Sequence, residues 1–333
     1  MRLNPLPCAA LALVFLPLQA GANDTSAALG AGGLTFERNE DVAIVSEDLF
    51  VSMDQIRVRY VFRNRSAKPV TTIVAFPLPA LKADMQESPL NIPNAGDPNF
   101  VAFETKVGGQ RVPLKLDRRA TFKSRDVTGM LVVNGAPLNP LAPGFSDKIA
   151  ALAPKDRDQL IKAGLIGKDE IDQGKGPEPY YRPAWDLATS YYRQQTFPPK
   201  QDVLVEHTYR PVVGGTVQPL LSSPEVWKTE QRRYKKAYCV DDAFEKAGAK
   251  LDPASTQERW ISYILKTGAN WAGPIGQFTL TVDKGASQNL VSFCGDDIKK
   301  ISPTQFQMRA KNYKPRKNKN LNVLILTPAS PAR

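Results

Sequence analysis

The chain has 333 residues, of which 42% are hydrophobic, and a formal net charge of +11. This length is sufficient for one large or two ordinary domains with real hydrophobic cores. Because His207 is the only histidine, Ser-His-Asp, Cys-His and histidine-rich zinc sites are impossible or reduced to that one residue. We expect His207 itself to be a core or sheet-face histidine that is bonded to backbone.

The first 22 residues have the features of a cleaved secretory signal. Arg2 gives a positive start, Ala9 to Leu18 is an apolar run, and Ala20-Gly21-Ala22 has the small-x-small form of a cleavage site. The run is too short to span a bilayer, and no later segment is apolar and long enough to do so. We therefore expect a mature protein that begins at Asn23, lies outside the cytoplasm and has no transmembrane segment.

Strand-like alternation dominates the next part of the chain. Ile56–Pro79 contains two alternating runs separated by a polar turn, and this pattern predicts an antiparallel hairpin with one apolar face. Gly108-Gly109 predicts a second tight hairpin between Phe100–Val107 and Gln110–Asp117, because paired glycines tolerate positive φ. Asn23–Leu34 is small, polar and glycine-rich, so we interpret it as a lead-in rather than as an element.

Alternation is lost after residue 117 and returns only after residue 200. Prolines recur in this stretch, Lys155–Leu165 has helical spacing, and Tyr180–Phe197 is strongly aromatic, which together predict a partly helical insert. Beyond it, Asp202–Arg210 alternates again and Val240–Ala249 is a helix candidate. Further strand-length segments follow at Arg259–Thr267, Gln277–Val282, Leu290–Phe293, Gln305–Ala310 and Leu321–Leu326.

About a dozen short strands with few helices predict a mainly β fold of antiparallel β-sandwich architecture, in two sandwich-like parts with a partly helical insert. The expected divisions are a signal peptide at 1–22, an N-terminal β-sandwich part at 23–117, an aromatic, partly helical insert at 118–200, and a C-terminal β-rich part with one disulfide at 201–333.

Cys239 and Cys294 are the two cysteines of the expected mature chain, and in an oxidising compartment we expect them to form that disulfide. Each is followed by the same spacing of acids, Asp241-Asp242 and Asp296-Asp297. A disulfide would bring these four carboxylates together, which makes them a weak calcium candidate. The alternative, which we favour, is helix capping by the first pair and a turn at the second.

Two runs of basic residues are candidates for binding an anion. The first contains Arg232, Arg233, Lys235 and Lys236, and the second contains Lys311, Lys314, Arg316, Lys317 and Lys319. In a cytosolic protein such runs would suggest nucleic acid. Outside the cytoplasm no nucleic acid is expected, and anionic lipid, lipopolysaccharide or acidic polymers are the more available partners. A solvated loop that favours solubility is the alternative for either run.

Several short motifs in order along the chain resemble a bacterial family catalogued as domain of unknown function 4424. They are Asn23-Asp24-Thr25-Ser26 with Gly32-Gly33-Leu34, Val58-Arg59-Tyr60 with Phe62-Arg63-Asn64, Phe76-Pro77-Leu78-Pro79, Phe197-Pro198, His207-x-Tyr209-x-Pro211 and Trp271-x-Gly273-Pro274-Ile275-Gly276. The resemblance covers nearly the whole mature chain and implies a periplasmic protein with no established activity. It supplies no catalytic residues.

Two hypotheses about function remain open at this stage. The first is a non-enzymatic envelope protein that binds an anionic or aromatic partner, either an envelope component or another periplasmic protein, and needs no cofactor. The second is a hydrolase or lyase acting on envelope glycans through loop carboxylates such as Glu104, Glu206 and Glu225. Two acids that face each other in a cleft under Tyr180–Phe197 would favour the enzyme.

Overall fold

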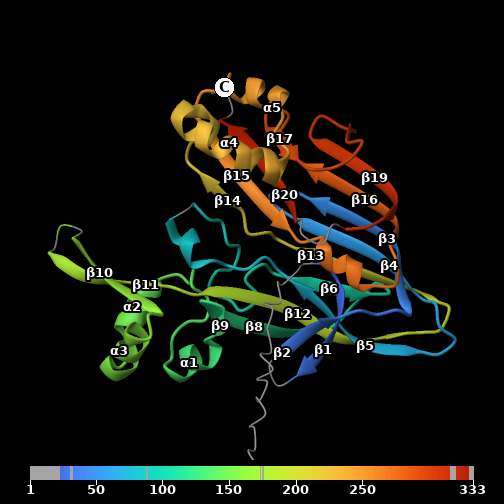
Figure 1. Cartoon of the computed structure of the whole chain (residues 1–333), viewed down its shortest axis with the longest axis horizontal. Coiled ribbons are helices and arrows are strands. Elements are labelled where there is room, and N and C mark those ends of the chain that lie inside the picture. The colour runs from blue at the N-terminus through green and yellow to red at the C-terminus, as the bar shows by residue number, and fades with distance from the viewer. Residues whose placement is uncertain are drawn as a thin grey trace, which may run out of the picture.

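The computed structural model describes residues 23–30, 33–87, 89–172, 174, 176–315 and 320–329. Its fold is mainly β, as predicted, with strands arranged in three larger sheets and one two-stranded hairpin (Figure 1). The α-helices lie at the periphery of these sheets (Figure 1). No helix in the described ranges is both long and apolar enough to cross a membrane.

The two largest sheets form the sandwich. The six-stranded sheet has the order β2-β1-β5-β12-β8-β9 and contains β1 (Thr25–Gly30), β2 (Gly33–Glu37), β5 (Val70–Pro77), β8 (Lys115–Phe122), β9 (Arg125–Asp126) and β12 (Asp186–Phe197). The eight-stranded sheet has the order β18-β19-β16-β3-β4-β13-β6-β7 and contains β3 (Val42–Val51), β4 (Ile56–Asn64), β6 (Glu104–Val107), β7 (Gln110–Arg111), β13 (Asp202–Tyr209), β16 (Ile275–Asp283), β18 (Lys299–Lys300) and β19 (Gln305–Tyr313).

A third sheet of four strands extends the sandwich and carries two helices on its outer face (Figure 1). Its order is β14-β15-β20-β17, with β14 (Gly214–Thr216), β15 (Thr256–Tyr263), β17 (Leu290–Phe293) and β20 (Leu321–Pro328). The helices are α4 (Pro224–Tyr238) and α5 (Asp242–Gly248). We call this sheet together with α4 and α5 the helical layer.

One hydrophobic core joins all three sheets. Phe62 of β4 has its ring centroid 5.6 Å from that of Phe197 on β12 and 4.9 Å from that of Trp271. Residues of β15 and β20 enter the same core, among them Tyr263 and Val323. Strands from residues 23–117, 118–200 and 201–333 therefore bury their apolar faces together, because alternate side chains of each strand point to one side.

The predicted hairpin at Ile56–Pro79 is wrong in its pairing, although both strands exist. β4 pairs with β3 and β13, whereas β5 pairs with β1 and β12 in the other large sheet. The connection is thus an arch from one sheet to the other. Asn64 fixes it, because its side-chain amide donates to the carbonyls of Lys68 at 2.7 Å and Phe197 at 2.9 Å. A hairpin and an arch bury the same alternate residues, so the alternation could not distinguish them.

Two other local predictions have different outcomes. Gly108 and Gly109 have φ of +55° and +81° and join β6 to β7, which confirms the tight turn. The interpretation of Asn23–Leu34 as a lead-in rather than an element is wrong, because β1 and β2 form a hairpin there and β1 also pairs with β5. Small residues build these strands, so they lack the large alternating side chains by which strands are usually predicted.

The stretch after residue 117 contains both an excursion and a central strand. The excursion has α1 (Thr128–Val133), α2 (Phe145–Ala150), α3 (Pro154–Lys162) and the hairpin of β10 (Ile166–Asp172) with β11 (Pro177–Pro183). Its own small core is centred on Leu131, Ile149 and Trp185. The expected loss of strand structure is wrong for β12, which pairs with β5 on one side and β8 on the other.

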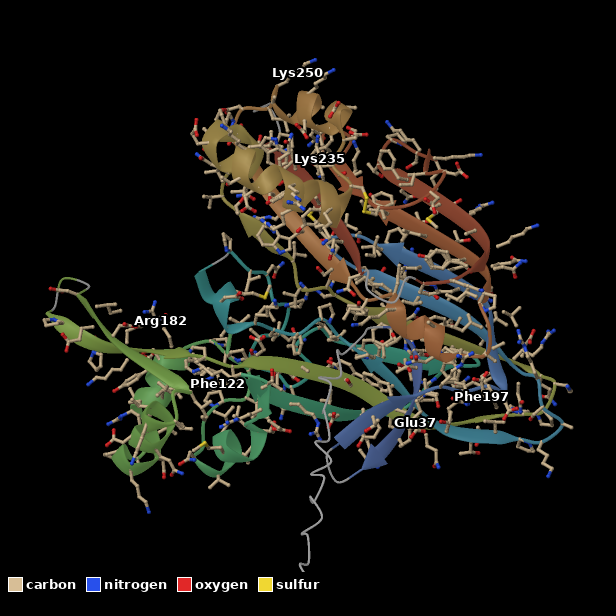
Figure 2. All side chains as sticks on the ribbon, in the orientation of Figure 1. Glu37, Phe122, Arg182, Phe197, Lys235 and Lys250 are labelled. Carbon is tan, nitrogen blue, oxygen red and sulfur yellow. A yellow bond between two sulfur atoms is a disulfide. The ribbon has the colours of Figure 1, made fainter. Side chains whose placement is uncertain are left out.

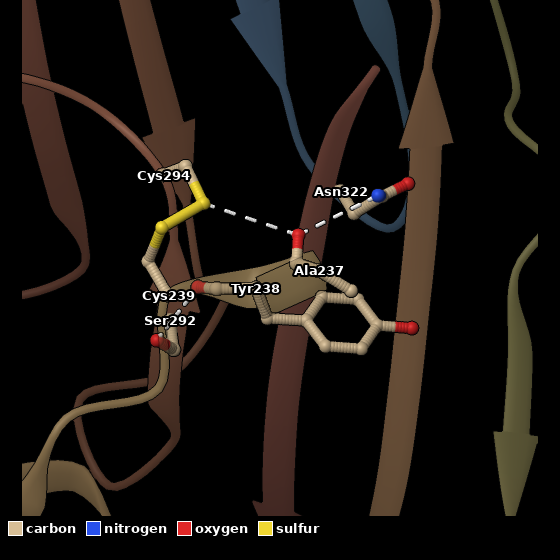
Figure 3. The surroundings of a disulfide bond; sticks show 6 residues. All are labelled: Ala237, Tyr238, Cys239, Ser292, Cys294 and Asn322. Atoms are coloured by element: carbon tan, nitrogen blue, oxygen red, sulfur yellow. Dashed lines mark hydrogen bonds between the residues drawn. A yellow bond between two sulfur atoms is a disulfide. The ribbon is translucent and has the colours of Figure 1, made fainter. Parts of the chain in front are cut away.

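The predicted disulfide is present and ties α4 to the four-stranded sheet (Figure 3). Cys239 follows the last residue of α4 in the left-handed conformation, and Cys294 follows β17. The two Cα atoms are 5.0 Å apart. Beside the disulfide, the hydroxyl of Ser292 donates to the carbonyl of Tyr238 at 3.0 Å, so the end of α4 has a second attachment to the sheet.

Candidate functional site

A cleft of about 630 Å³ lies where the helical layer meets the loops that follow β5 and β13. Aromatic side chains from three elements form much of its wall, and apolar residues such as Leu78 and Val101 complete it. The aromatic residues are Phe100 in the loop before β6, Tyr209 at the end of β13, Tyr234 and Tyr238 on α4, and Trp260 on β15. We call this the aromatic cleft.

Trp260 occupies its place in the wall because the neighbouring strand carries a glycine. Gly214 of β14 is paired with Trp260, and a Cβ built on Gly214 would lie 2.2 Å from the indole Nε1. Any larger residue at position 214 would displace the indole. Gly214-Gly215 is therefore not a turn, which would be the usual interpretation of paired glycines, but a short edge strand beneath an aromatic ring.

One buried polar group of the wall has no hydrogen-bond partner among the described residues. It is the hydroxyl of Tyr209. Burial raises the pKa of Tyr238 to about 12 and raises that of Tyr209 further. A buried tyrosine usually pairs its hydroxyl, so Tyr209 offers a donor that a ligand could use.

Tyr234 is different because its hydroxyl already has a hydrogen-bond partner. It donates to Glu258, a fully buried carboxyl that also accepts from the backbone N–H of Leu220 at 3.1 Å. Burial raises the pKa of Glu258, and burial next to this carboxyl raises the pKa of Tyr234. This contact attaches α4 to β15 and makes the Tyr234 side of the cleft a rigid wall.

Cationic side chains border the cleft. Arg233 lines it, lies 4.8 Å from the centroid of the Tyr234 ring and forms an ion pair with Glu230. Lys82 also lines it and is exposed. Among the described lining residues the one carboxylate is the exposed Asp84. The arrangement therefore suits an apolar or aromatic body that carries a negative group.

Comparison with known proteins places the chain in a family. The model of a domain of unknown function, DUF4424, matches residues 22–324. The chain belongs to the DUF4424 family. No curated protein matches this DUF4424 protein. The match confirms the family resemblance that the short sequence motifs indicated, over nearly the whole of the expected mature chain.

Among solved structures, this DUF4424 protein is similar to one from Legionella pneumophila, a "putative nutrient binding protein". The two chains are 16% identical, the similarity covers 92% of this chain and 70% of the other, and the TM-score is 0.42. At that score we draw no conclusion from the likeness about what this chain binds.

The predicted anion-binding residues of the first basic run lie on α4, a helix that was not predicted. Arg233 reaches the aromatic cleft, whereas Lys235 forms ion pairs with Asp242 at 3.4 Å and Glu245 at 3.1 Å. Arg232 and Lys236 are exposed. Figure 2 shows Lys235 and Lys250 on the helical layer, far from Phe197 at the other end of the sandwich. The structure thus brings one member of this run to the cleft.

The second basic run is only partly described. Lys311 and Lys314 are exposed, the former at the end of β19. Arg316, Lys317 and Lys319 lie outside the described residues. Asn320, the next described residue along the chain, lines the aromatic cleft. Both basic runs of this DUF4424 protein therefore have a described neighbour or member at the same cleft.

The four aspartates of the calcium candidate have separate surroundings. Asp241 caps α5, since its side chain accepts from the N–H of Phe244 at 2.7 Å, which confirms the expected capping role. Asp242 is paired with Lys235. Asp296 and Asp297 are exposed after Cys294, and Asp297 has φ of +50°. Within the described ranges, no group of three or more histidines, cysteines or acids is placed to hold a metal.

His207 is a core histidine, as expected, but its partners are side chains rather than backbone. Its Nδ1 lies 2.8 Å from the hydroxyl of Thr105, and its Nε2 lies 3.0 Å from a carboxylate oxygen of Asp24. The residue types resemble an acid, a histidine and a nucleophile, yet all three are buried inside the sandwich and none lines the aromatic cleft. A structural role accounts for this arrangement.

The acids considered for catalysis are dispersed. Glu104 on β6 pairs with Arg111, and Glu225 is in the first turn of α4. A second cleft of about 630 Å³, in the excursion after β9, is lined by two other acids, Asp147 and Glu178. Both side chains are exposed. Solvated acids lack the desolvated surroundings that a general acid needs, so this cleft is the weaker candidate.

Proposed function

We propose that this protein is an exported, non-enzymatic binding module whose ligand occupies the aromatic cleft. The observation that carries the proposal is a concave wall rich in aromatic side chains that includes Tyr209, whose buried hydroxyl has no hydrogen-bond partner among the described residues. An apolar concave site with a few convergent polar groups is the usual form of a small-molecule site. Unpaired buried groups gain a partner when a ligand binds there.

The chemistry of the wall indicates the class of ligand. Flat rings on Trp260 and the tyrosines favour a ligand with a planar face. Arg233 and Lys82 favour a negative group at the border, and Arg233 is held in place by its contact with the Tyr234 ring. A small aromatic or cyclic carboxylate combines both properties. The expected signal peptide places this ligand outside the cytoplasm, in the periplasm.

Calorimetric titration of the mature protein with phenylacetate, and with its neutral counterpart 2-phenylethanol, tests the proposal. We expect the carboxylate to bind more tightly, because two cations border the cleft. Trp260→Ala should weaken binding of both compounds by about tenfold or more, as loss of a central aromatic anchor does. Arg233→Gln should weaken binding of the carboxylate alone.

Arg232→Gln is the matched control, because Arg232 is the exposed sequence neighbour of Arg233 and does not line the cleft. It should bind phenylacetate as the unaltered protein does. Binding that is indifferent to Trp260→Ala would show that the ligand site lies elsewhere. Product formation, followed by NMR on glycan fragments of the envelope, would instead favour the hydrolase or lyase alternative.

A further inference from the structure

The first residues of the expected mature chain lie inside the protein. Asn23, Asp24 and Thr25 are each 0% exposed. They precede or begin β1, and they contact η3 (Lys266–Asn270), a short 3₁₀ segment between β15 and β16. Chain ends are usually at the surface, where their charge is solvated. Burial at this position therefore requires a specific site that receives the end of the chain.

That site is built around Asn23. The hydroxyl of Tyr60 donates to its side-chain oxygen, and the hydroxyl of Thr267 donates to its carbonyl at 2.8 Å. Its side-chain Nδ2 lies 2.6 Å from the position that a Cβ on Gly268 would occupy, so only glycine leaves room there. Trp271 adds a bond to the next residue, since its indole N–H donates to the carbonyl of Asp24 at 2.6 Å.

Glu47 of β3 faces the same site and lacks a counter-charge. Its Oε2 accepts from Nδ2 of Asn23 at 3.3 Å, whereas its Oε1 is buried without a hydrogen-bond partner. No lysine, arginine or histidine is among the described groups that act on its pKa. Burial raises the pKa of Glu47 to about 8, and the nearby carboxylates of Asp24 and Asp48 add to this effect. A buried acid of this kind needs either a proton or a cation.

The other ionisable groups around the site do not supply that cation. His207 on β13 is paired with Asp24. Arg193 on β12 is buried, and Asp24 is the carboxylate that acts on it. Tyr60 on β4 and Tyr263 on β15 are buried, which raises the pKa of both and keeps them neutral. Asp24 therefore has an imidazole and a guanidinium as neighbours, and neither group acts on the pKa of Glu47.

We propose that the α-amino group of Asn23, released when the chain is cut after Ala22, is the internal counter-charge of Glu47. The backbone nitrogen of an asparagine lies within about 5 Å of its own Nδ2 by covalent geometry, and Nδ2 of Asn23 is in contact with Glu47. Before cleavage this nitrogen is a neutral amide. Cleavage converts it into an ammonium group that can pair with the unpartnered Oε1, so removal of the leader completes the core.

This pairing has a defined pH dependence. An α-amino group has an ordinary pKa of about 7.7–8.0 in an unfolded chain. Pairing with Glu47 raises its pKa in the folded protein. The stabilisation is therefore present at neutral pH and is lost as pH rises through the raised value. It is also lost in acid, where the Glu47 carboxylate takes up a proton and the ion pair no longer exists. A chain that keeps residues before Asn23 has no such group and lacks this dependence.

Two otherwise identical chains test the proposal, one beginning at Asn23 and one retaining Gly21-Ala22. At pH 7 we expect the unfolding equilibrium constant of the shorter chain, from urea titration, to be at least tenfold smaller, and the difference to disappear above about pH 10. Glu47→Gln should abolish the difference, whereas Asp48→Asn, an exposed neighbour on the same strand, should preserve it. Equal stability of the two chains, or a difference that survives Glu47→Gln, would overturn the proposal.

A second measurement does not require any variant to fold. An amine-reactive ester at neutral pH, followed by mass analysis of the amino-terminal peptide, reports whether the α-amino group of Asn23 is accessible. In the native mature protein we expect it to be protected, while exposed lysines such as Lys250 react. It should react once the protein is unfolded in urea. Labelling of the native protein at the rate of the unfolded chain would place this amino group in solvent and contradict the inference.

Discussion

The sandwich and the helical layer are stabilised in different ways. The sandwich has a large apolar core and contains ionisable side chains inside it, among them Asp24, His207 and Glu47. The helical layer has a core of six buried side chains among the described residues, and it adds the Cys239–Cys294 disulfide and a capped α5. A large core tolerates buried polar groups if they are paired, whereas a small one needs covalent and capping support.

The largest effect is expected where the sandwich loses one partner of its buried pair. His207→Ala removes the imidazole between Thr105 and Asp24 and leaves a buried carboxylate without its partner. The free energy of unfolding should fall by about 3–5 kcal/mol, measured by urea titration. Arg59→Ala is the control, because Arg59 and Asp48 form an exposed pair that contributes only about 0–1 kcal/mol. Similar losses in both variants would show that burial does not distinguish the two pairs.

In the helical layer the corresponding change is loss of the disulfide. Replacing Cys239 and Cys294 together by serine should lower the free energy of unfolding by about 2–4 kcal/mol. Hydrogen exchange should locate the effect, with faster exchange of amides in α4 and α5 and little change in β4. Uniformly faster exchange throughout the chain would indicate that the helical layer and the sandwich unfold as one unit.

A smaller effect is expected at the arch between the two large sheets. Asn64→Ala removes the donor to the carbonyls of Lys68 and Phe197. Leaving these groups unpaired should cost about 1–3 kcal/mol, read from the thermal midpoint and the urea transition. Ser66→Ala in the same connection removes two exposed neutral bonds with Lys68 and should cost less than Asn64→Ala, because water can replace them. The reverse order would mean that Asn64 does not fix the arch.

The smallest expected effect concerns the cap of α5. Asp241→Ala removes the acceptor for the N–H of Phe244 and should cost about 1 kcal/mol. The unaltered protein, titrated with calcium and then with a chelator, tests the metal alternative. The capping role predicts a thermal midpoint that does not change with calcium. A calcium-dependent rise that is lost in both Asp241→Asn and Asp296→Asn would favour the shared cation site.

The sequence was sufficient where local pattern and local structure coincide. Alternation along β4 and β13 identified both strands, and the position of Asp241 before a helical run identified the start of α5. α4 was missed, although Trp227, Tyr234 and Tyr238 recur at helical spacing behind Pro224, because the basic residues between them suggested a solvated loop. A helical periodicity check on the aromatic residues would have found it.

Neither the arch nor the aromatic cleft could be predicted locally. Tyr209, Tyr238 and Trp260 lie on a strand, a helix and another strand, and only the order of strands brings them together. The burial of Asn23 was hidden for a similar reason, since its partners Glu47, Tyr60 and Thr267 are distant in the sequence. The partners of a strand in a sheet depend on competition among all strands, which no short window contains.

The parallel contact between β3 and β16 determines when the eight-stranded sheet can close. Leu49 pairs with Leu280, so the centre of the sheet joins segments near opposite ends of the chain. Closing so long a loop costs entropy before the contact is gained, and folding dominated by such contacts is slow. Until β16 arrives, β3 presents an open edge to other chains. We expect a chain that ends before Ile275 to aggregate, as light scattering during refolding would show, and the intact protein to fold only after nearly all of it is present.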